Sequence, residues 1–131
     1  MKIIMIGLTC VILAVGAFVS ATDAQSKIRV RFARGTLSAT VTGSVRGFQY
    51  KDYVVGASAG QNMRVRLDQN TNAVFTIFQP GGDNLDTAAE TDEYDGALPA
   101  SGDYVVRVMM MRNEARRRGS FTNYRLTISI R

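Results

Sequence analysis

The chain has 131 residues, of which 16 are basic and 11 acidic, giving a net charge of +5; it has no histidine and one cysteine, Cys10. Without a histidine, and without a cysteine beyond position 10, a serine or cysteine nucleophile activated by a histidine base is excluded, as are the usual zinc sites. Paired carboxylates of the glycosidase kind are the remaining alternative at Asp92, Glu93 and Asp95, but a polar loop rarely gives the cleft that they need. We therefore predict a protein that is not an enzyme and that holds no cofactor.

The first two dozen residues have the layout of a signal peptide. A positive start precedes an apolar run over 3–19, and Ala21 and Ala24 each end a pattern of small residues suited to cleavage. We expect residues 1–24 to be removed, with a cut after Ala21 as the alternative. The run is short for a bilayer, which needs about 20 apolar residues, so a stable membrane anchor is not expected. Export also removes nucleic acid as a partner of this basic chain.

Residues 25–131 are enough for one domain with one core. Seven stretches show the two-residue period of half-buried strands, and turn residues separate them. In chain order they are 28–32, 37–41, 53–57, 63–67, 74–78, 104–111 and 124–130. No long helical pattern is present to make parallel crossovers. The sequence therefore predicts an all-β domain, an antiparallel β-sandwich of about seven or eight strands, with a barrel as the alternative.

An acidic stretch at 83–95 interrupts this strand rhythm, and we interpret it as a loop. Clustered carboxylates suit calcium, but their spacing does not follow the calcium loop of helix-loop-helix proteins. Solvated charge is the alternative interpretation, and no metal site is predicted.

A basic stretch at 112–123 is the second interruption. Its first residues fit one helical turn capped by Gly119, with Glu114 and Arg118 spaced as an ion pair. Arginine's planar fork matches carboxylates, so the cluster suits an acidic partner, although a solvated loop is the plain alternative.

The segment Ser101-Gly102-Asp103-Tyr104 opens the strand at 104–111. It has two interpretations: a turn whose tyrosine packs inward, or an exposed tip whose serine and tyrosine hydroxyls bond to another protein. If Tyr104 shares the face of Val106 and Val108, its ring packs at the core edge while its hydroxyl stays in water.

Several of these segments together resemble known families. The residues Asp52-Tyr53, Ala59-Gly60-Gln61 and Ser101-Gly102-Asp103-Tyr104 loosely resemble bacterial pre-peptidase C-terminal domains. The stretch at 110–119, followed by Asn123-Tyr124-Arg125-Leu126, more specifically resembles the periplasmic inhibitors of g-type and i-type lysozymes. This resemblance implies a periplasmic inhibitor, with secretion as the alternative, that inserts a loop of a β-sandwich into a lysozyme's active-site cleft. The g-type enzyme is favoured over the i-type.

The resemblance also implies which residues bind lysozyme. Ser101, Gly102 and Tyr104 correspond to the family's Ser-Gly-x-Tyr element, and Arg112, Asn113 and Arg116 correspond to its arginine-rich stretch. Arg118 departs from the pattern and leaves open which arginine faces the enzyme. On this view Tyr104→Ala weakens inhibition and leaves the fold intact.

Two other functions remain open from the sequence. One is a non-catalytic carbohydrate- or cell-wall-binding β-sandwich module, and the other is an envelope protein whose basic face adheres to anionic lipid. A homodimer is also left open.

Overall fold

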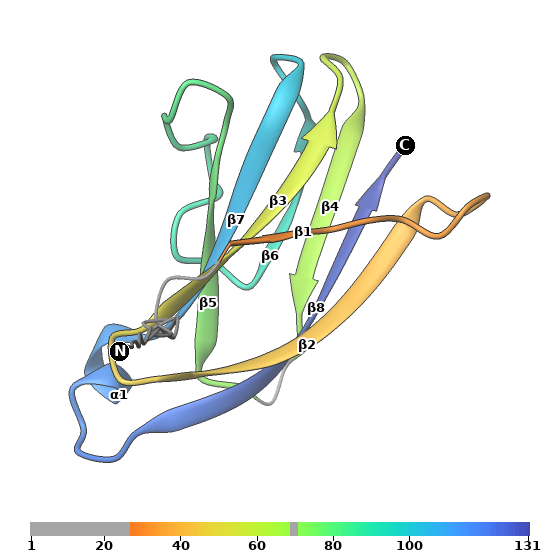
Figure 1. Ribbon diagram of the computed structural model, residues 1–131. Coiled ribbons are helices and arrows are strands. Elements are labelled where there is room, and N and C mark those ends of the chain that lie inside the picture. Colours follow the sequence, from red (N-terminus) through yellow and green to blue (C-terminus); the bar gives the residue numbers. More distant parts are fainter. Residues whose placement is uncertain (1–26, 69–70) are drawn as a thin grey trace, which may run out of the picture.

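The computed structural model describes residues 27–68 and 71–131, which fold into two four-stranded sheets packed face to face (Figure 1). The elements are β1 (Lys27–Arg29), β2 (Ser38–Arg46), β3 (Tyr50–Ala57), β4 (Asn62–Leu67), β5 (Ala73–Phe78), β6 (Glu93–Ala97), β7 (Gly102–Met110), α1 (Arg112–Ala115) and β8 (Phe121–Ile130). The predicted all-β sandwich is confirmed. The predicted signal peptide, 1–24, lies outside the described residues. Among the residues described, no helix is long and apolar enough to cross a membrane.

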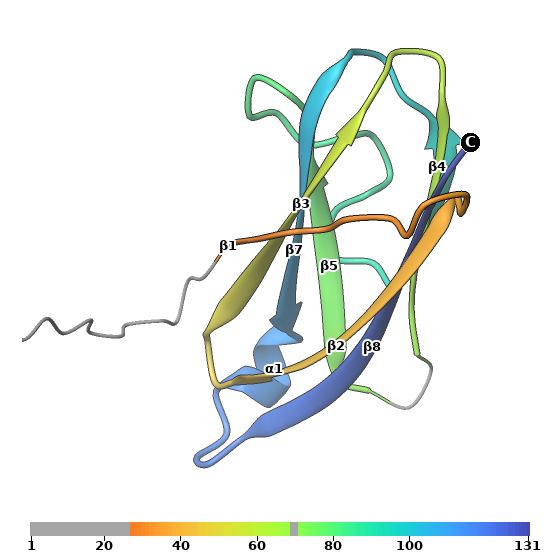
Figure 2. The same ribbon diagram turned by 45° about the vertical axis from the view of Figure 1, so that its right-hand side comes forward.

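One sheet has the order β1-β3-β7-β5 and the other β2-β8-β4-β6. Neighbouring strands are antiparallel except for β1 and β3, which run parallel. The parallel pair arises because the chain leaves β1, crosses to the other sheet to form β2, and returns to the first sheet as β3 (Figure 2). The strand predicted at 28–32 is therefore shorter than expected and ends at Arg29.

The core lies between the sheets and follows the predicted alternation. Val65, Val106 and Leu126 face inward and are fully buried. Tyr53 of β3 and Tyr124 of β8 meet across the core, with their hydroxyl oxygens 2.6 Å apart and their rings edge to face. Gly43 is required beside them, because a Cβ there would lie 2.6 Å from the Tyr124 hydroxyl. The two sheets are thus joined by a buried hydrogen bond as well as by apolar packing.

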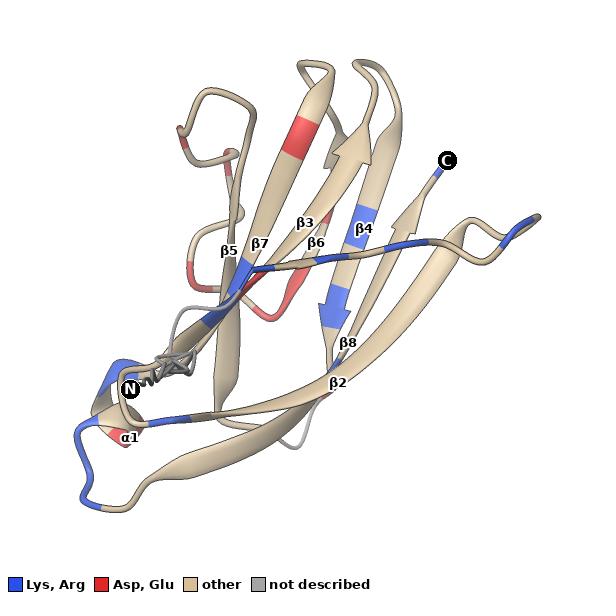
Figure 3. Cartoon of the chain, viewed as in Figure 1, with Lys and Arg blue, Asp and Glu red and all other residues tan. Residues whose placement is uncertain are grey.

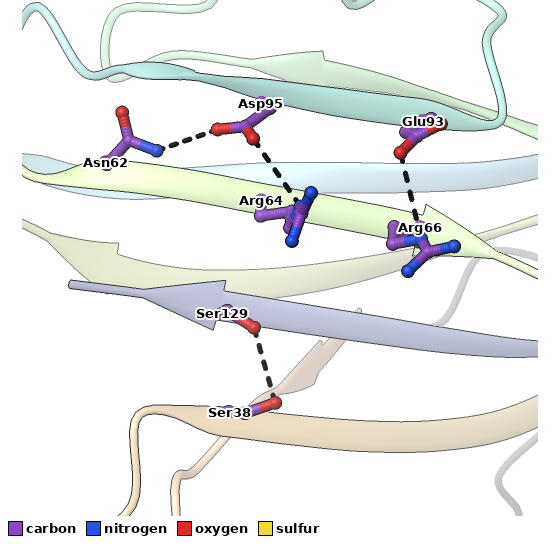
Figure 4. Close-up of polar contacts among 7 residues, drawn as sticks. All are labelled: Ser38, Asn62, Arg64, Arg66, Glu93, Asp95 and Ser129. Atoms are coloured by element: carbon purple, nitrogen blue, oxygen red, sulfur yellow. Dashed lines mark hydrogen bonds and ion pairs between the residues drawn. The ribbon is translucent and has the colours of Figure 1, made fainter.

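The acidic stretch contains an eighth strand that the sequence pattern did not predict. β6 pairs with β4, and its outward carboxylates, Glu93 and Asp95, lie 3.8 Å from Arg66 and 3.5 Å from Arg64 (Figure 4). The interpretation of all of 83–95 as a loop was wrong because acidic residues are poor strand formers and only Tyr94 shows the inward register. These exposed ion pairs contribute little to stability.

The rest of the acidic stretch lies along the edge of β5. The Leu85 amide donates to the Ile77 carbonyl at 2.9 Å, and the Thr91 amide donates to the Phe75 carbonyl at 2.9 Å. Leu85 and Ala88 are buried. The apolar residues of this segment therefore attach it to the sheet while its carboxylates face solvent. The described part of the chain contains no cluster of three or more acidic, histidine or cysteine side chains able to hold a metal ion.

Candidate functional site

Strand β7 separates the six predicted binding residues into two groups. Ser101, Gly102 and Tyr104 lie at its beginning, whereas Arg112, Asn113 and Arg116 follow its end. A strand of nine residues spans roughly 30 Å, so the groups occupy opposite ends of the sandwich (Figure 1). We name them the loop end, formed by the turns at 58–61, 79–82 and 98–102, and the α1 end. The α1 end comprises Arg46, the turn at 47–49, α1, the turn at 116–120 and Phe121.

At the loop end, each predicted residue has a partner within the chain. The Ser101 hydroxyl accepts a hydrogen bond from the Ala59 amide at 2.8 Å. Gly102 has a φ of 142°, and a Cβ there would lie 3.0 Å from Pro80. The Tyr104 hydroxyl donates to the Ala100 carbonyl at 2.5 Å and accepts from the Ala100 amide at 3.2 Å. The Ser101 bond joins the turns at 98–102 and 58–61, the Tyr104 bonds close the turn at 98–102, and Gly102 allows this turn to approach Pro80.

The expectation of a solvent-exposed Tyr104 hydroxyl was wrong. Tyr104 does share the inward face of Val106 and Val108, but its whole side chain is buried, with 0% exposed. The chain folds back over the hydroxyl at Ala100 and supplies both a donor and an acceptor. Tyr104 is therefore an anchor of the loop end and offers no surface to a partner. Neither interpretation of the sequence anticipated that the Tyr104 hydroxyl would form hydrogen bonds with the backbone of Ala100, four residues earlier in the chain.

At the α1 end, a single helical turn leaves most of its side chains in solvent. Ala115 is its one buried residue, and Arg112, Asn113 and Arg116 are exposed. The helix ends at Ala115 with Arg116 as its C-cap, and Glu114 pairs with Arg117 at 3.4 Å. The predicted Glu114–Arg118 pair was wrong: it requires helical geometry that continues through residue 118, whereas the chain leaves the helix after Ala115 and brings Arg117 to Glu114 instead.

The turn after α1 is fastened to the rest of this end by backbone contacts. The Ser120 hydroxyl donates to the Ala115 carbonyl at 3.1 Å, and the Gly47 amide donates to the Ser120 carbonyl at 3.1 Å. Gly119 has a φ of 71°, which lets the chain reverse into β8 and which glycine adopts without strain. Gly119 is thus a turn residue, not the predicted helix cap.

The α1 end combines exposed aromatic rings with arginines. Phe48 and Phe121 are 69% and 52% exposed, and the Arg46 guanidinium lies 5.2 Å from the centre of the Phe121 ring. Five arginines and one glutamate make this end strongly positive (Figure 3). The arginines are Arg46, Arg112, Arg116, Arg117 and Arg118. Exposed aromatics beside arginines have the composition of binding hot spots.

A hollow of about 190 Å³ adjoins this end, lined in part by Phe48, Tyr50, Arg107 and Arg112. Arg107 donates two hydrogen bonds to the buried carboxylate of Asp52, at 2.8 and 3.0 Å. These bonds raise the pKa of Arg107 above its ordinary value. Its guanidinium also lies 4.0 Å from the centre of the Tyr50 ring. The wall of the hollow is therefore a fixed positive charge stacked on an aromatic ring.

The sequence pattern did not identify Arg46, Phe48 and Phe121 as members of this end. Phe121 carried a usable signal, since it occupies the outward register that Asn123 and Arg125 occupy further along β8. A large apolar residue in a polar register is predicted to be exposed, which makes it a candidate contact residue. Phe48 lies in a short turn, and nothing in its neighbours indicated that it would be exposed.

Comparisons with known proteins place this fold among lysozyme inhibitors, although no family model matches the chain. A curated inhibitor of g-type lysozyme from Escherichia coli (strain K12) is 35% identical over 99 residues, covering 72% of this chain and 74% of the relative. The crystal structure of PliG from Aeromonas hydrophila, a periplasmic lysozyme inhibitor of g-type lysozyme, is 37% identical with a TM-score of 0.71, covering 82% of this chain and 97% of that one.

Two further solved structures are similar to a lesser degree. PliG from Salmonella Typhimurium is 33% identical with a TM-score of 0.68, covering 81% of this chain and 98% of that one. A pre-peptidase C-terminal domain of a collagenase from Bacillus anthracis is 11% identical with a TM-score of 0.47, covering 86% of this chain and all of that one. The resemblance to lysozyme inhibitors predicted from the sequence is confirmed.

Proposed function

Because this chain belongs to the family of inhibitors of g-type lysozyme, we propose that it is a periplasmic protein that binds a g-type lysozyme and blocks its attack on peptidoglycan. The identity of 35% to the curated inhibitor supports the function, and the g-type enzyme named for each of these relatives favours it over the i-type. We further propose that residues 1–24, or 1–21, are removed on export and that 25–131 form the working domain.

The α1 end is the surface that we propose enters the lysozyme's active-site cleft. Glycosidase clefts carry catalytic carboxyl groups, and the exposed Arg112 and Arg116 present planar forks that pair with carboxylates. Phe48 and Phe121 add exposed apolar area to the same end. Inhibition then works by occupying the cleft, without chemistry.

Preorganisation is the second support for this choice. The turn after α1 is fastened through Ser120 to both Ala115 and Gly47, so little conformational entropy is lost when it meets a partner. Within this proposal Ser101, Gly102 and Tyr104 shape the loop end. A single cleft does not contact both groups, since the length of β7 separates them.

The test compares lysis of a peptidoglycan suspension by g-type, i-type and c-type lysozymes, each with and without the exported protein. We expect inhibition of the g-type enzyme alone. A protein that inhibits none of the three but sediments with peptidoglycan would instead be the wall-binding module, and the proposed function would be wrong.

A matched pair of double variants locates the inhibitory surface. We expect Arg112→Ala with Arg116→Ala to weaken inhibition by more than about tenfold, the loss typical of hot-spot arginines. Arg64→Ala with Arg66→Ala removes the same charge from the outer face of β4, where both side chains lie in exposed ion pairs. If both double variants lose inhibition equally, the α1 end acts only through the protein's overall positive charge and is not the inhibitory surface.

A further inference from the structure

The positive charge of this protein is concentrated in one part of the chain. Residues 27–51 contain six Lys or Arg and no Asp or Glu, whereas residues 52–131 contain nine Lys or Arg against ten Asp or Glu. The first segment therefore has a net charge of +6 and the second a net charge of −1. The surplus positive charge of the domain comes from its first segment.

Most of these cations lie on residues 27–37, which we name the basic arm. The arm leaves one sheet at its edge strand β1 and crosses to the start of β2, the edge strand of the other sheet (Figure 3). Its four cations are Lys27, Arg29, Arg31 and Arg34, and all four are exposed. The arm thus forms a positive ridge along one side of the sandwich.

The arm is fixed to the sandwich on its inner side. The Val30 amide donates to the Val54 carbonyl at 2.9 Å, and the Val30 side chain is buried. Because side chains alternate along an extended chain, Arg29 and Arg31 on either side of Val30 face solvent. At the far end of the arm, the Leu37 carbonyl accepts a hydrogen bond of 3.0 Å from β8. The ridge is therefore already formed before it meets a partner.

The arm also exposes apolar side chains beside its cations. Ile28 is 39% exposed and Leu37 is 60% exposed. Proteins that bind the headgroup region of a membrane have this composition, because the cations meet phosphates while the apolar side chains enter the acyl boundary. A soluble polyanion would use the cations alone and would leave Ile28 and Leu37 in water.

The cations of the arm are open to an external anion. Within the described residues, one of them is in an ion pair, since Arg29 lies 2.7 Å from Asp103. Both side chains of that pair are about half exposed, so the pair is weak. Arg31 and Arg34 extend from the arm beyond it.

The carboxylates are concentrated on the opposite side of the sandwich. The sheets have the orders β1-β3-β7-β5 and β2-β8-β4-β6, so the arm joins the two strands at one side and the acidic stretch at 83–95 joins the two strands at the other. Six of the ten carboxylates of residues 52–131 lie in that stretch. A negatively charged surface therefore attracts one side of the protein and repels the other, which places the arm against the surface.

We propose that the basic arm binds the surface of an anionic phospholipid membrane, peripherally and reversibly. The relatives of this chain are periplasmic, and the membranes that bound the periplasm supply such headgroups. The nine residues of β2 put roughly 30 Å between Leu37 and Arg46 of the α1 end. A membrane-bound protein therefore leaves the α1 end accessible, and lipid binding is separate from the proposed inhibition.

The first test is cosedimentation of the exported protein with two kinds of vesicle. One kind contains phosphatidylethanolamine and phosphatidylglycerol, and the other contains phosphatidylcholine alone. We expect binding to the vesicles with phosphatidylglycerol only, and we expect it to weaken steeply as salt is added, because salt screens the attraction between the exposed charges. Binding to neither kind, or equal binding to both, would overturn the proposal.

A matched pair of double variants locates the lipid-binding surface. Arg31→Ala with Arg34→Ala should weaken binding to the anionic vesicles by about 25-fold, at a factor of about five for each cation near the surface. Inhibition of lysozyme by this variant should be unchanged. Arg112→Ala with Arg116→Ala removes the same charge from the α1 end and should bind the vesicles nearly as well as the unmodified protein. Equal losses of vesicle binding would contradict a specific role of the arm.

A third variant distinguishes a membrane from a soluble polyanion. Ile28→Ala with Leu37→Ala keeps every charge of the arm and removes its exposed apolar area. We expect this variant to bind anionic vesicles about fivefold more weakly, since binding at a membrane interface scales with the apolar area buried there. Its binding to heparin, a soluble polyanion, should be unchanged. Vesicle binding as tight as that of the unmodified protein would assign the arm to a soluble polyanion and overturn the proposal.

Discussion

Both ends of the sandwich contain residue types that are common at interfaces, but only one end exposes them. At the loop end, the Ser101 and Tyr104 hydroxyls are bonded to the backbone of the chain itself. At the α1 end, Arg112 and Phe48 extend into solvent while the backbone beneath them is fastened. Residue types favoured at interfaces thus do not identify an interface until burial and hydrogen-bond partners are known.

The largest effect that separates the ends is expected at Tyr104. Its ring is among the largest fully buried side chains, so Tyr104→Ala should lower the free energy of unfolding by about 3–5 kcal/mol, as other buried aromatic truncations do. Tyr104→Phe keeps the ring and loses only the bonds to Ala100, at about 1 kcal/mol. Urea denaturation measures both, and the folded Tyr104→Phe variant should inhibit lysozyme normally. If the folded Tyr104→Phe variant fails to inhibit, the loop end takes part in binding lysozyme.

The reverse behaviour is expected at the α1 end. Phe48→Ala with Phe121→Ala removes two exposed rings, so the urea midpoint should barely change while inhibition weakens by about tenfold or more. Leu37→Ala is the control, since Leu37 is also 60% exposed but lies before β2. A double variant as potent as the unmodified protein would show that the apolar part of this end is not used.

Gly102 tests whether the loop end is a structural unit. Its φ is 142°, and the Cβ of an alanine there would lie 3.0 Å from Pro80, so Gly102→Ala is strained and should cost about 1–3 kcal/mol in unfolding free energy. Gly60→Ala is the control: its φ of 89° also strains an alanine, but a Cβ there meets no neighbouring atom. The difference between the two variants therefore measures the clash with Pro80. Thermal unfolding of both should show the larger loss for Gly102→Ala, and inhibition at a temperature where both are folded should be unchanged.

The smallest effect at neutral pH concerns the tyrosine pair that joins the sheets between the two ends. Burial raises the pKa of Tyr53 and of Tyr124 above the ordinary value of 10.0, and the bond between them raises that of Tyr124 further. The unfolded chain then releases these protons first, so stability is fully present below pH 10 and falls as pH rises above it. Urea midpoints across this range should fall less steeply for the variant Tyr53→Phe with Tyr124→Phe. Equal slopes would show that other groups govern alkaline unfolding.

Much of the fold follows from local patterns. The alternation of Met63, Val65 and Leu67 correctly predicted β4 and its buried face, because a strand's period of two assigns each residue to a side. The same pattern failed for β6, because this strand has only two inward positions, Tyr94 and Gly96, and two residues do not establish an alternation. Arg64 and Arg66, which lie opposite the β6 carboxylates, come from a distant part of the chain and cannot be read locally.

The candidate site was less predictable than the fold. The arginine-rich stretch and its single helical turn were recognised as unusual, but Arg46 and Phe48 join them only through the contact between the turn at 47–49 and Ser120. The sequence also suggested that all six residues form one binding surface, whereas the structure places them at opposite ends of the sandwich, because the extended strand β7 lies between the two groups.

By itself, the sequence determined that this protein is an all-β sandwich without histidine-dependent catalysis and that it resembles lysozyme inhibitors. Periodicity, turn residues and composition are local properties, and they are sufficient for the fold and for the absence of such catalysis, whereas the resemblance rests on the residues at 110–119 and 123–126. Only the tertiary structure decided that Tyr104 is covered, that β7 holds the two groups of candidate residues at opposite ends, and that the basic arm lies on the side of the sandwich opposite the acidic stretch. Each of these depends on which distant segment packs against a residue, and a strand's alternation gives the side a residue faces but not what lies there.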